Sequence, residues 1–169
     1  DRIHDILELF ANTGQKPDPH EMFTVRGDYN GKPWSRVVYP GQIADAAICL
    51  IPPGAKAESE VVLTRPNGIR WKVKRDLRIA GPVPEVRDYK TTSDFEYVAE
   101  KDLASDTQAQ LYAWAEFEET PEAGTVHLHW QFLRTKGKPE SHSLRRNETR
   151  EHNAQQMALI DAGAERWIQ

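Results

Sequence analysis

The sequence predicts a single α/β domain in which a mixed central β-sheet is flanked by α-helices. Its 169 residues, 19.3 kDa, are enough for one domain with its own hydrophobic core. Helical and strand-like hydrophobic patterns follow one another in the order helix, strands, helix, strand, helix. Mean hydropathy is low, −0.70, but 5 Trp, 5 Tyr and 5 Phe supply core side chains that a disordered chain lacks.

The N-terminal part begins with a predicted amphipathic helix over residues 2–11, whose apolar side chains recur at helical spacing. Residues 15–45 are rich in Gly, Pro, Asp and Asn, and we expect them to be irregular, which is unusually long for a compact domain. Residues 46–51 are apolar and stop at Pro52, which indicates a short buried strand.

Three strands are predicted in the middle of the chain. Residues 60–64 and 69–79 flank Asn67–Gly68, a strong signal for a tight hairpin turn. A second turn at residues 80–82 leads into a strand over residues 83–89.

The C-terminal part is predicted to hold a helix over residues 103–119, with Ser105 or Asp106 as its N-cap, and a final helix over residues 147–167. Between them a strand over residues 125–133 alternates cleanly. One of its faces holds Val126, Leu128, Trp130 and Phe132, and the other holds His127, His129 and Gln131.

Composition excludes several classes of protein. Cys49 is the single cysteine, which excludes an internal disulfide, a multi-cysteine zinc site and a four-cysteine iron–sulfur cluster, and its apolar neighbours predict a buried, unreactive thiol. No apolar run approaches the roughly 20 residues of a membrane span, and no signal-peptide pattern is present. We therefore expect a cytoplasmic protein with no membrane contact. The start at Asp1 rather than Met predicts a domain excised from a longer protein.

Charge is segregated along the chain, although its net value is only −4. Residues 70–90 hold seven Lys or Arg against three acids, and residues 134–150 hold six against two. Two basic segments on an acidic background suit a groove that follows phosphates, the sequence-independent part of DNA binding. The alternative is a set of solvated strand and helix faces, which is favoured when charge is considered alone.

The second hairpin brings two carboxylates together. If its turn centres on Pro82, Asp76 lies directly opposite Asp88, with Cβ atoms about 4.5–5.5 Å apart, and Lys90 projects from the same face. Two carboxylates this close repel each other unless a cation lies between them, and hard oxygen ligands suit Mg²⁺ or Mn²⁺. A lysine beside them suits the orientation of a water or the stabilisation of charge on a phosphate. The alternative is an exposed hairpin with scattered charges, because a one-residue shift of register reverses the faces.

Short motifs at four places along most of the chain resemble the PD-(D/E)XK nuclease superfamily. Residues 85–92, Glu-Val-Arg-Asp-Tyr-Lys-Thr-Thr, with Asp76 upstream, resemble its active-site hairpin. Residues 108–113, Gln-Ala-Gln-Leu-Tyr-Ala, resemble the Gln-x-x-x-Tyr helix motif of its RecB-like exonuclease branch. The connecting residues 92–108 and the first helix around His4 are similar to RecB-like nucleases of phage and mobile-element type. The resemblance implies a restriction-endonuclease-like core.

The resemblance also implies roles for individual residues. The metal ligands would be Asp76, Asp88, His4 and the backbone carbonyl of Tyr89, and the catalytic lysine would be Lys90. Gln108 and Tyr112 match the helix motif that supports the site and helps to hold DNA; they lie one turn apart on one helix face. From the basic segments, the residues expected to contact DNA are Lys74, Arg75, Arg78, Arg134 and Lys136.

The implied reaction is hydrolysis of a DNA phosphodiester assisted by Mg²⁺ or Mn²⁺. The implied enzyme is an exonuclease that acts on DNA ends in recombination, repair or phage DNA processing, with a helicase or recombinase as a candidate partner. Two alternatives stay open. One is an endonuclease on the same fold, and the other is a catalytically weak or inactive nuclease-like domain that binds DNA or acts as a scaffold.

Other residues suit further sites. His127 and His129 share a strand face and suit a His-x-His metal site, but no third ligand is evident and an exposed polar face is the favoured interpretation. Glu58 or Glu60 is a candidate for an extra acidic ligand, with a solvated strand edge as the alternative. Trp34, in the polar irregular region, is the best placed tryptophan for stacking on a base.

Overall fold

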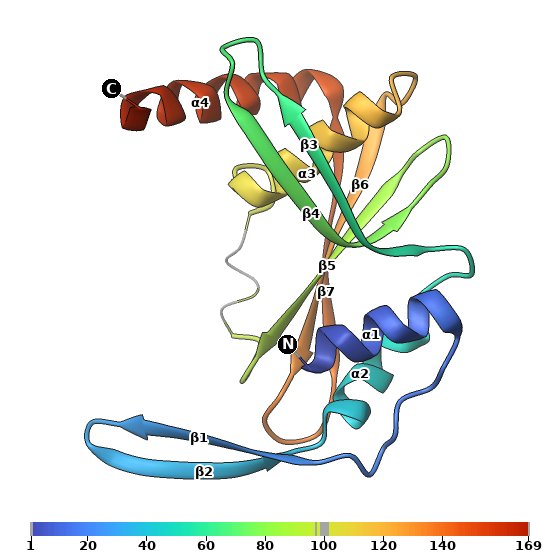
Figure 1. The fold of residues 1–169 in the computed structure, drawn as a ribbon, viewed down its shortest axis with the longest axis vertical. Helices are drawn as coiled ribbons and strands as arrows, with labels where there is room; N and C mark the ends of the chain where they lie inside the picture. The colour runs from blue at the N-terminus through green and yellow to red at the C-terminus, as the bar shows by residue number, and fades with distance from the viewer. Residues whose placement is uncertain (1, 97, 99–101, 169) are drawn as a thin grey trace.

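The computed structural model describes residues 2–96, 98 and 102–168, and within this part a five-stranded sheet forms the centre of the fold (Figure 1). The strand order is β3–β4–β5–β6–β7; β5 and β6 run parallel, and the other neighbours are antiparallel. The strands are β3 (Lys56–Thr64), β4 (Arg70–Ile79), β5 (Glu85–Thr92), β6 (Thr125–Arg134) and β7 (Ser141–Thr149). The predicted α/β class and mixed sheet are confirmed.

Helices cover both faces of this sheet (Figure 1). On one side α3 packs against β4 and β6, and α4 packs against α3 and β7. On the other side α1 and α2 pack against each other and against strands β3, β4 and β6. The bounds of the helices are α1 (Arg2–Thr13), α2 (Pro40–Ile48), α3 (Thr107–Glu119) and α4 (Arg150–Ile168).

The sheet therefore separates two hydrophobic cores. The α3 side buries Val86, Leu128 and Trp130, whereas the α1 side buries Leu77 and Tyr89. Val86 and Tyr89 lie on one strand and enter opposite cores because their positions differ by an odd number of residues. β5 is thus covered on both faces, which explains why its polar residues are held in defined places.

The prediction that residues 15–45 are irregular is wrong. It contains a hairpin of β1 (Phe23–Tyr29) and β2 (Lys32–Val38), followed by α2. Asn30 and Gly31 form the turn with φ of 53° and 75°, as a tight hairpin requires. Most residues of this hairpin are exposed, so its strands lack the alternation of buried apolar residues that would have revealed them.

The predicted strand over residues 46–51 is also wrong, because most of that stretch belongs to α2 or follows its end. Pro40 is at the start of α2, where its missing N–H costs nothing, and the helix then buries Ile43, Ala44 and Ala47. Cys49 is the first residue after the helix and is exposed, which corrects the prediction of a buried thiol.

Two boundaries in the C-terminal part differ from the prediction. α3 begins at Thr107 because the Asp106 side chain accepts a 2.8 Å hydrogen bond from Ala109 N and caps the helix. The predicted final helix starts too early, since β7 extends to Thr149 and α4 begins at Arg150. β7 is an edge strand with polar side chains. It is held by backbone pairing with β6 and lacks the hydrophobic alternation by which a strand is recognised in a sequence.

The polar face of β6 is not exposed as the sequence suggested. His129 and Gln131 are 2% and 1% exposed, because the α1 and α2 side of the sheet covers them. His129 Nδ1 lies 3.4 Å from Glu85 Oε1 on the neighbouring strand. This hydrogen bond, assisted by Arg87, lowers the pKa of Glu85 to about 2.

Two arginines that were expected to contact DNA form ion pairs within the fold. Arg75 is 1% exposed, donates to Ser59 Oγ at 3.0 Å and forms ion pairs with Glu116 and Glu119 of α3. Arg78 donates to Glu116 at 2.9 Å. A buried guanidinium whose donors are bound by carboxylates cannot reach a phosphate, so the prediction for Arg75 is corrected. Arg78 is 20% exposed and shares Glu116 with it, so its contact with DNA stays a prediction.

The Glu85 carboxylate should stabilise the fold only above acidic pH. The pKa of Glu85 is lower in the folded protein than in the unfolded chain, where it is 4.5. The ionised carboxylate therefore adds to the free energy of unfolding above pH 4.5, and this stabilisation is lost as the pH falls towards 2. We expect Glu85→Gln to reduce the free energy of unfolding at pH 7 by about 1–2 kcal/mol, allowing for solvent screening of a partly exposed group.

Urea unfolding of both proteins between pH 7 and pH 2.5 tests this expectation. The difference between Glu85→Gln and the parent protein should shrink as the pH falls. Glu140→Gln is the control, because Glu140 pairs with Arg134 but is 45% exposed. A pH-independent difference for Glu85→Gln would contradict the assignment.

Candidate active site

The turn between β4 and β5 has the register that the sequence predicts. Leu77 pairs with Arg87 and Ile79 pairs with Glu85, and continuing this register by one residue sets Asp76 opposite Asp88. The backbone ladder stops before that point, so the two strands separate where the two aspartates lie.

A bend shared by β3 and β4 produces this separation. Ser59 of β3 and its partner Arg75 of β4 face α3. Ala57 and Leu77, the next pair on the same face of a regular ladder, instead belong to the core under α1. Between them lie Glu58, with a φ of 51°, and Asp76. A positive φ at a residue other than glycine is uncommon and marks a sharp local change in strand direction. Asp76 is therefore at the point where β4 turns away from β5.

The Asp76 side chain occupies the gap between the strands. Its Oδ2 accepts a 2.8 Å hydrogen bond from Tyr89 N, a donor that an unbroken ladder would have paired with the β4 backbone. His4 of α1 reaches the same place, with its Nε2 2.6 Å from the Tyr89 carbonyl oxygen and 3.9 Å from Asp76 Oδ2. Three potential ligand atoms from α1, β4 and β5 thus meet at one point.

A small cavity of about 10 Å³ adjoins these atoms. It is lined by His4, Glu8, Glu58, Asp76 and Tyr89, together with Leu7 and Leu77. A cavity of this size holds one water-sized species. Glu58 is one of the two acids that the sequence suggests as an extra ligand, whereas Glu8 was not predicted. Glu8 lies one helical turn after His4, and this spacing is the sequence signal that could have revealed it.

On the α3 side, four side chains form a closed hydrogen-bonded group. Lys90 Nζ lies 2.6 Å from Asp88 Oδ2 and donates to Gln108 Oε1 at 2.9 Å. Gln108 Nε2 donates to Asp88 Oδ1 at 3.0 Å and to the Tyr112 hydroxyl at 2.7 Å. Tyr112 donates in turn to Asp88 Oδ1 at 3.2 Å. β5 supplies Asp88 and Lys90, and successive turns of α3 supply the other two.

This group makes Asp88 an unusual carboxylate. Its side chain is 2% exposed, whereas that of Lys90 is 33% exposed. Burial raises the pKa of Asp88 above its ordinary value; the Lys90 hydrogen bond opposes this shift, and the negative charge of Asp76 adds to it. Asp88 Oδ2 is buried, and the Lys90 ammonium 2.6 Å away is its partner. The charge of Asp76 thus disfavours the ionised form of Asp88.

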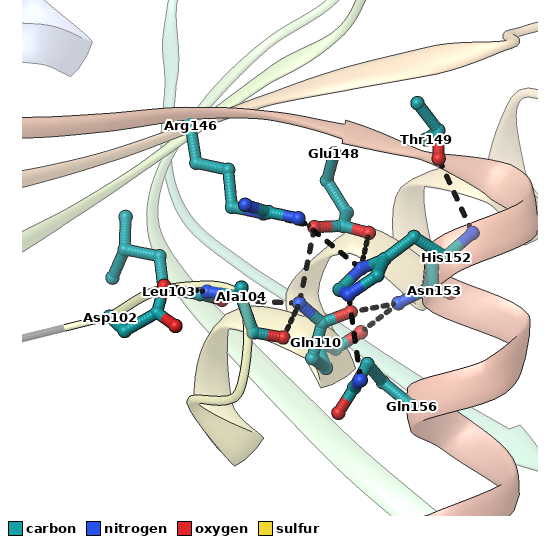
Figure 2. Close-up of polar contacts among 10 residues, drawn as sticks. All are labelled: Asp102, Leu103, Ala104, Gln110, Arg146, Glu148, Thr149, His152, Asn153 and Gln156. Atoms are coloured by element: carbon teal, nitrogen blue, oxygen red, sulfur yellow. Dashed lines mark hydrogen bonds and ion pairs between the residues drawn. The ribbon is translucent and has the colours of Figure 1, made fainter.

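A second polar network holds the start of α3 in place (Figure 2). The Gln110 side chain donates to the carbonyls of Leu103 and Ala104 at 3.1 and 3.0 Å and to Glu148 of β7 at 3.2 Å. Asn153 of α4 donates to Gln110 Oε1 at 2.9 Å. Because Gln110 and Glu148 are fully buried, this network fixes the turn of α3 that carries Gln108.

Several atoms of this site are accepted ligands of a divalent cation. Carboxylate, carbonyl and imidazole groups suit Mg²⁺ or Mn²⁺, and His4 Nε2, the Tyr89 carbonyl oxygen and Asp76 Oδ2 meet beside the small cavity. Among the described residues, no three His, Cys, Asp or Glu side chains form a group able to hold a metal. As the side chains lie, Asp76, Asp88 and His4 therefore do not together enclose one ion.

The remaining predicted contacts with DNA lie at different places. Lys74 is exposed on β4 and forms an ion pair with Glu58 beside the small cavity. Arg134 and Lys136 lie at the far end of β6 and in the turn after it, where they line a different cavity. The structure thus places the seven predicted catalytic and metal-ligand residues in two groups, three on the α1 side of the sheet and four on the α3 side, and it disperses the five predicted DNA contacts. The seven are His4, Asp76, Asp88, Tyr89, Lys90, Gln108 and Tyr112.

Comparison with known proteins does not identify the chain. No model of a known protein family matches the sequence, and a search of curated proteins finds no significant match. In the described part of the chain, none of the helices has the length and apolar character needed to cross a membrane.

The raised pKa of Asp88 predicts that its charge destabilises the fold. The pKa of Asp88 is higher in the folded protein than in the unfolded chain, where it is 3.8. The stability that this group contributes is therefore greatest below pH 3.8 and is lost as the pH rises through the pKa of the folded protein. Asp88→Asn keeps an acceptor for Gln108 and removes the buried charge. We expect it to raise Tm at pH 7 in EDTA by roughly 2–4 °C, on the order of 1 kcal/mol.

Thermal unfolding followed by circular dichroism measures this effect. Asp94→Asn in the loop after β5 is the control for the loss of one aspartate. A lower Tm for Asp88→Asn than for the parent protein at pH 7 would show that the carboxylate is stabilising, which is the opposite of our expectation.

Proposed function

We propose that this chain is a metal-dependent DNA nuclease of RecB-like type on a restriction-endonuclease-like core. The observation that supports it most directly is the β4–β5 register, which sets Asp76 opposite Asp88, together with the ion pair of Asp88 with Lys90. Mutually repelling carboxylates beside a lysine cost stability, and such an arrangement is typical of a site retained for chemistry.

The residues have distinct roles in this proposal. Asp76, Asp88, His4 and the Tyr89 carbonyl would hold Mg²⁺ or Mn²⁺. When bound, such an ion polarises a phosphate and lowers the pKa of a coordinated water. Lys90, partly exposed and paired with Asp88, donates hydrogen bonds to the attacking water or to a phosphate oxygen. Gln108 and Tyr112 hold Asp88 and Lys90 in place.

The overall reaction is hydrolysis. The water oxygen bonds to phosphorus, one phosphorus–oxygen ester bond breaks, and the proton of the water ends on the leaving sugar oxygen or in solvent. The products are a phosphomonoester and a free hydroxyl. An exonuclease on DNA ends is the favoured form, and an endonuclease or a DNA-binding scaffold are the other outcomes of the test below.

Lys90→Met tests the chemistry directly. Methionine keeps most of the aliphatic length and removes the charge, so we expect hydrolysis of linear DNA in Mg²⁺ or Mn²⁺ to slow by about 10²–10³-fold. Lys72→Met is the matched control, because Lys72 is 65% exposed on β4 and pairs only with Glu60 among the described residues. Equal rates for Lys90→Met and Lys72→Met would overturn the role of Lys90.

The same digest on linear and circular DNA, with and without EDTA, separates the forms of the proposal. Degradation of linear DNA alone supports an exonuclease, and nicking of circles supports an endonuclease. Binding without cleavage, also in Mn²⁺, supports a scaffold. We expect Asp88→Ala to abolish turnover and to keep or improve DNA binding, because it removes a carboxylate that faces phosphate. Undiminished cleavage by Asp88→Ala would contradict the proposed site.

A further inference from the structure

The β1–β2 hairpin projects from the body as a separate two-stranded arm (Figure 1). Its tip is a tight turn in which the Asp28 side chain accepts a 2.7 Å hydrogen bond from Gly31 N. All seven residues of each strand are paired, from Phe23 with Val38 to Tyr29 with Lys32. The arm is therefore an ordered element whose two faces are defined by strand alternation.

One face of this arm presents aromatic and cationic side chains in alternation. Lys32, Trp34 and Arg36 share this face of β2, and Tyr29 lies across from Lys32. Trp34 and Tyr29 are 42% and 73% exposed. Aromatic rings of this size are seldom left so open on a small protein without a function.

Trp34 is held in a fixed position. It lies across from Gly27, and a Cβ atom at Gly27 would come within 2.5 Å of the indole ring. The ring therefore lies directly on the backbone of β1. The guanidinium carbon of Arg36, two residues further along β2, is 5.8 Å from the centroid of this ring. A pre-positioned ring loses little conformational entropy when a second planar group stacks on it.

Arg36 lies between two cavities at the base of the arm. Cavities of about 450 and 520 Å³ both include Arg36 in their lining. Its Nη2 donates one long hydrogen bond of 3.3 Å to Thr135, and its buried Nε has no acceptor. Among the described residues no carboxylate pairs with Arg36, so this cation lacks an anionic partner.

The two cavities lie on the α1 side of the sheet and hold cations without acids. No Asp or Glu of the described chain lines either one. Arg134 and Lys136 line the first and Arg2 lines the second, while Arg134 pairs with Glu140 and Arg2 with Glu21 outside the linings. The second also includes Ile3, the chain neighbour of His4, and Thr91, which points to the opposite face of β5 from Lys90. In a chain of net charge −4, an acid-free groove beside the start of α1 is a local exception.

We infer that the exposed face of the β1–β2 arm binds single-stranded DNA and leads it towards the α1 side of the candidate site, where His4 and Asp76 lie. Arg36 and Lys32 contact phosphates, while Trp34 and Tyr29 stack on bases. Stacking on exposed aromatic side chains beside a basic groove is the general mode of single-strand recognition, and the bases of a duplex do not offer free faces. The inference rests on the proposed function for its substrate class, but binding is measured separately from cleavage.

Fluorescence anisotropy in EDTA tests the arm without hydrolysis. The probe is a labelled single strand of about 20 nucleotides, longer than the roughly 4–16 nucleotides that a single-strand-binding fold covers. We expect Trp34→Ala to weaken binding about 5- to 100-fold and Trp34→Tyr to restore most of it. Tyr29→Ala, at a highly exposed tip residue, should weaken binding with no change in Tm.

A matched pair of arginine variants separates a specific interaction from a general effect of charge. Arg36→Gln removes the cation on the aromatic face, and Arg26→Gln removes one from the opposite face of the same arm. For Arg36→Gln we expect weaker binding. We also expect the slope of the logarithm of the binding constant against the logarithm of the salt concentration to be shallower by about 0.7 for each phosphate that the variant no longer neutralises. For Arg26→Gln we expect less than about a twofold change in affinity, because it touches no phosphate.

The outcomes distinguish this inference from the proposed function. If the parent protein binds and cleaves DNA but Trp34→Ala, Tyr29→Ala and Arg36→Gln bind the single strand as it does, the arm is not the binding surface and the nuclease proposal stands. Stronger binding of a blunt duplex, unaffected by these variants, also overturns the inference. If the parent protein neither binds nor cleaves any DNA, both proposals fail.

Discussion

The candidate site depends on one broken backbone pairing, the point at which β4 leaves β5. An antiparallel ladder normally pairs each inward N–H with a carbonyl of the neighbouring strand. Here Tyr89 N bonds to the carboxylate of Asp76 instead. That exchange turns the backbone of β5 into part of a polar site, because it leaves the Tyr89 carbonyl free to meet His4.

The cost of this opening is distributed over the surrounding fold. Covering β5 on both faces keeps water out, and this raises the pKa of Asp88 but also strengthens its contacts with Lys90 and Gln108. Glu85, three residues earlier on the same strand, is stabilised as an anion by His129 and Arg87. Two carboxylates on one strand thus have opposite electrostatic environments, and only the destabilised one is at the candidate site.

Basic residues that are neighbours in the sequence have different uses in the structure. Arg75 and Arg78 bind Glu116 and tie β4 to α3, whereas Lys74 remains at the surface and pairs with Glu58. The two acid-free cavities share Arg36, which lies in a region whose composition shows no excess of basic residues. Local charge density along the chain is therefore a poor guide to a binding surface, because the partners of each cation are distant in sequence.

The sequence alone determined the strands around the turn at Pro82 and their register, which sets Asp76 opposite Asp88, because a tight turn and strand alternation are local properties. It also determined the pairing of Gln108 with Tyr112, which follows from helical spacing. Only the tertiary structure decided that Glu8 and Glu58 line the small cavity with His4, that Arg75 and His129 are buried, and that residues 23–38 form an arm. Those outcomes depend on packing between segments far apart in the chain, and no local pattern encodes which of many polar side chains will find a partner there.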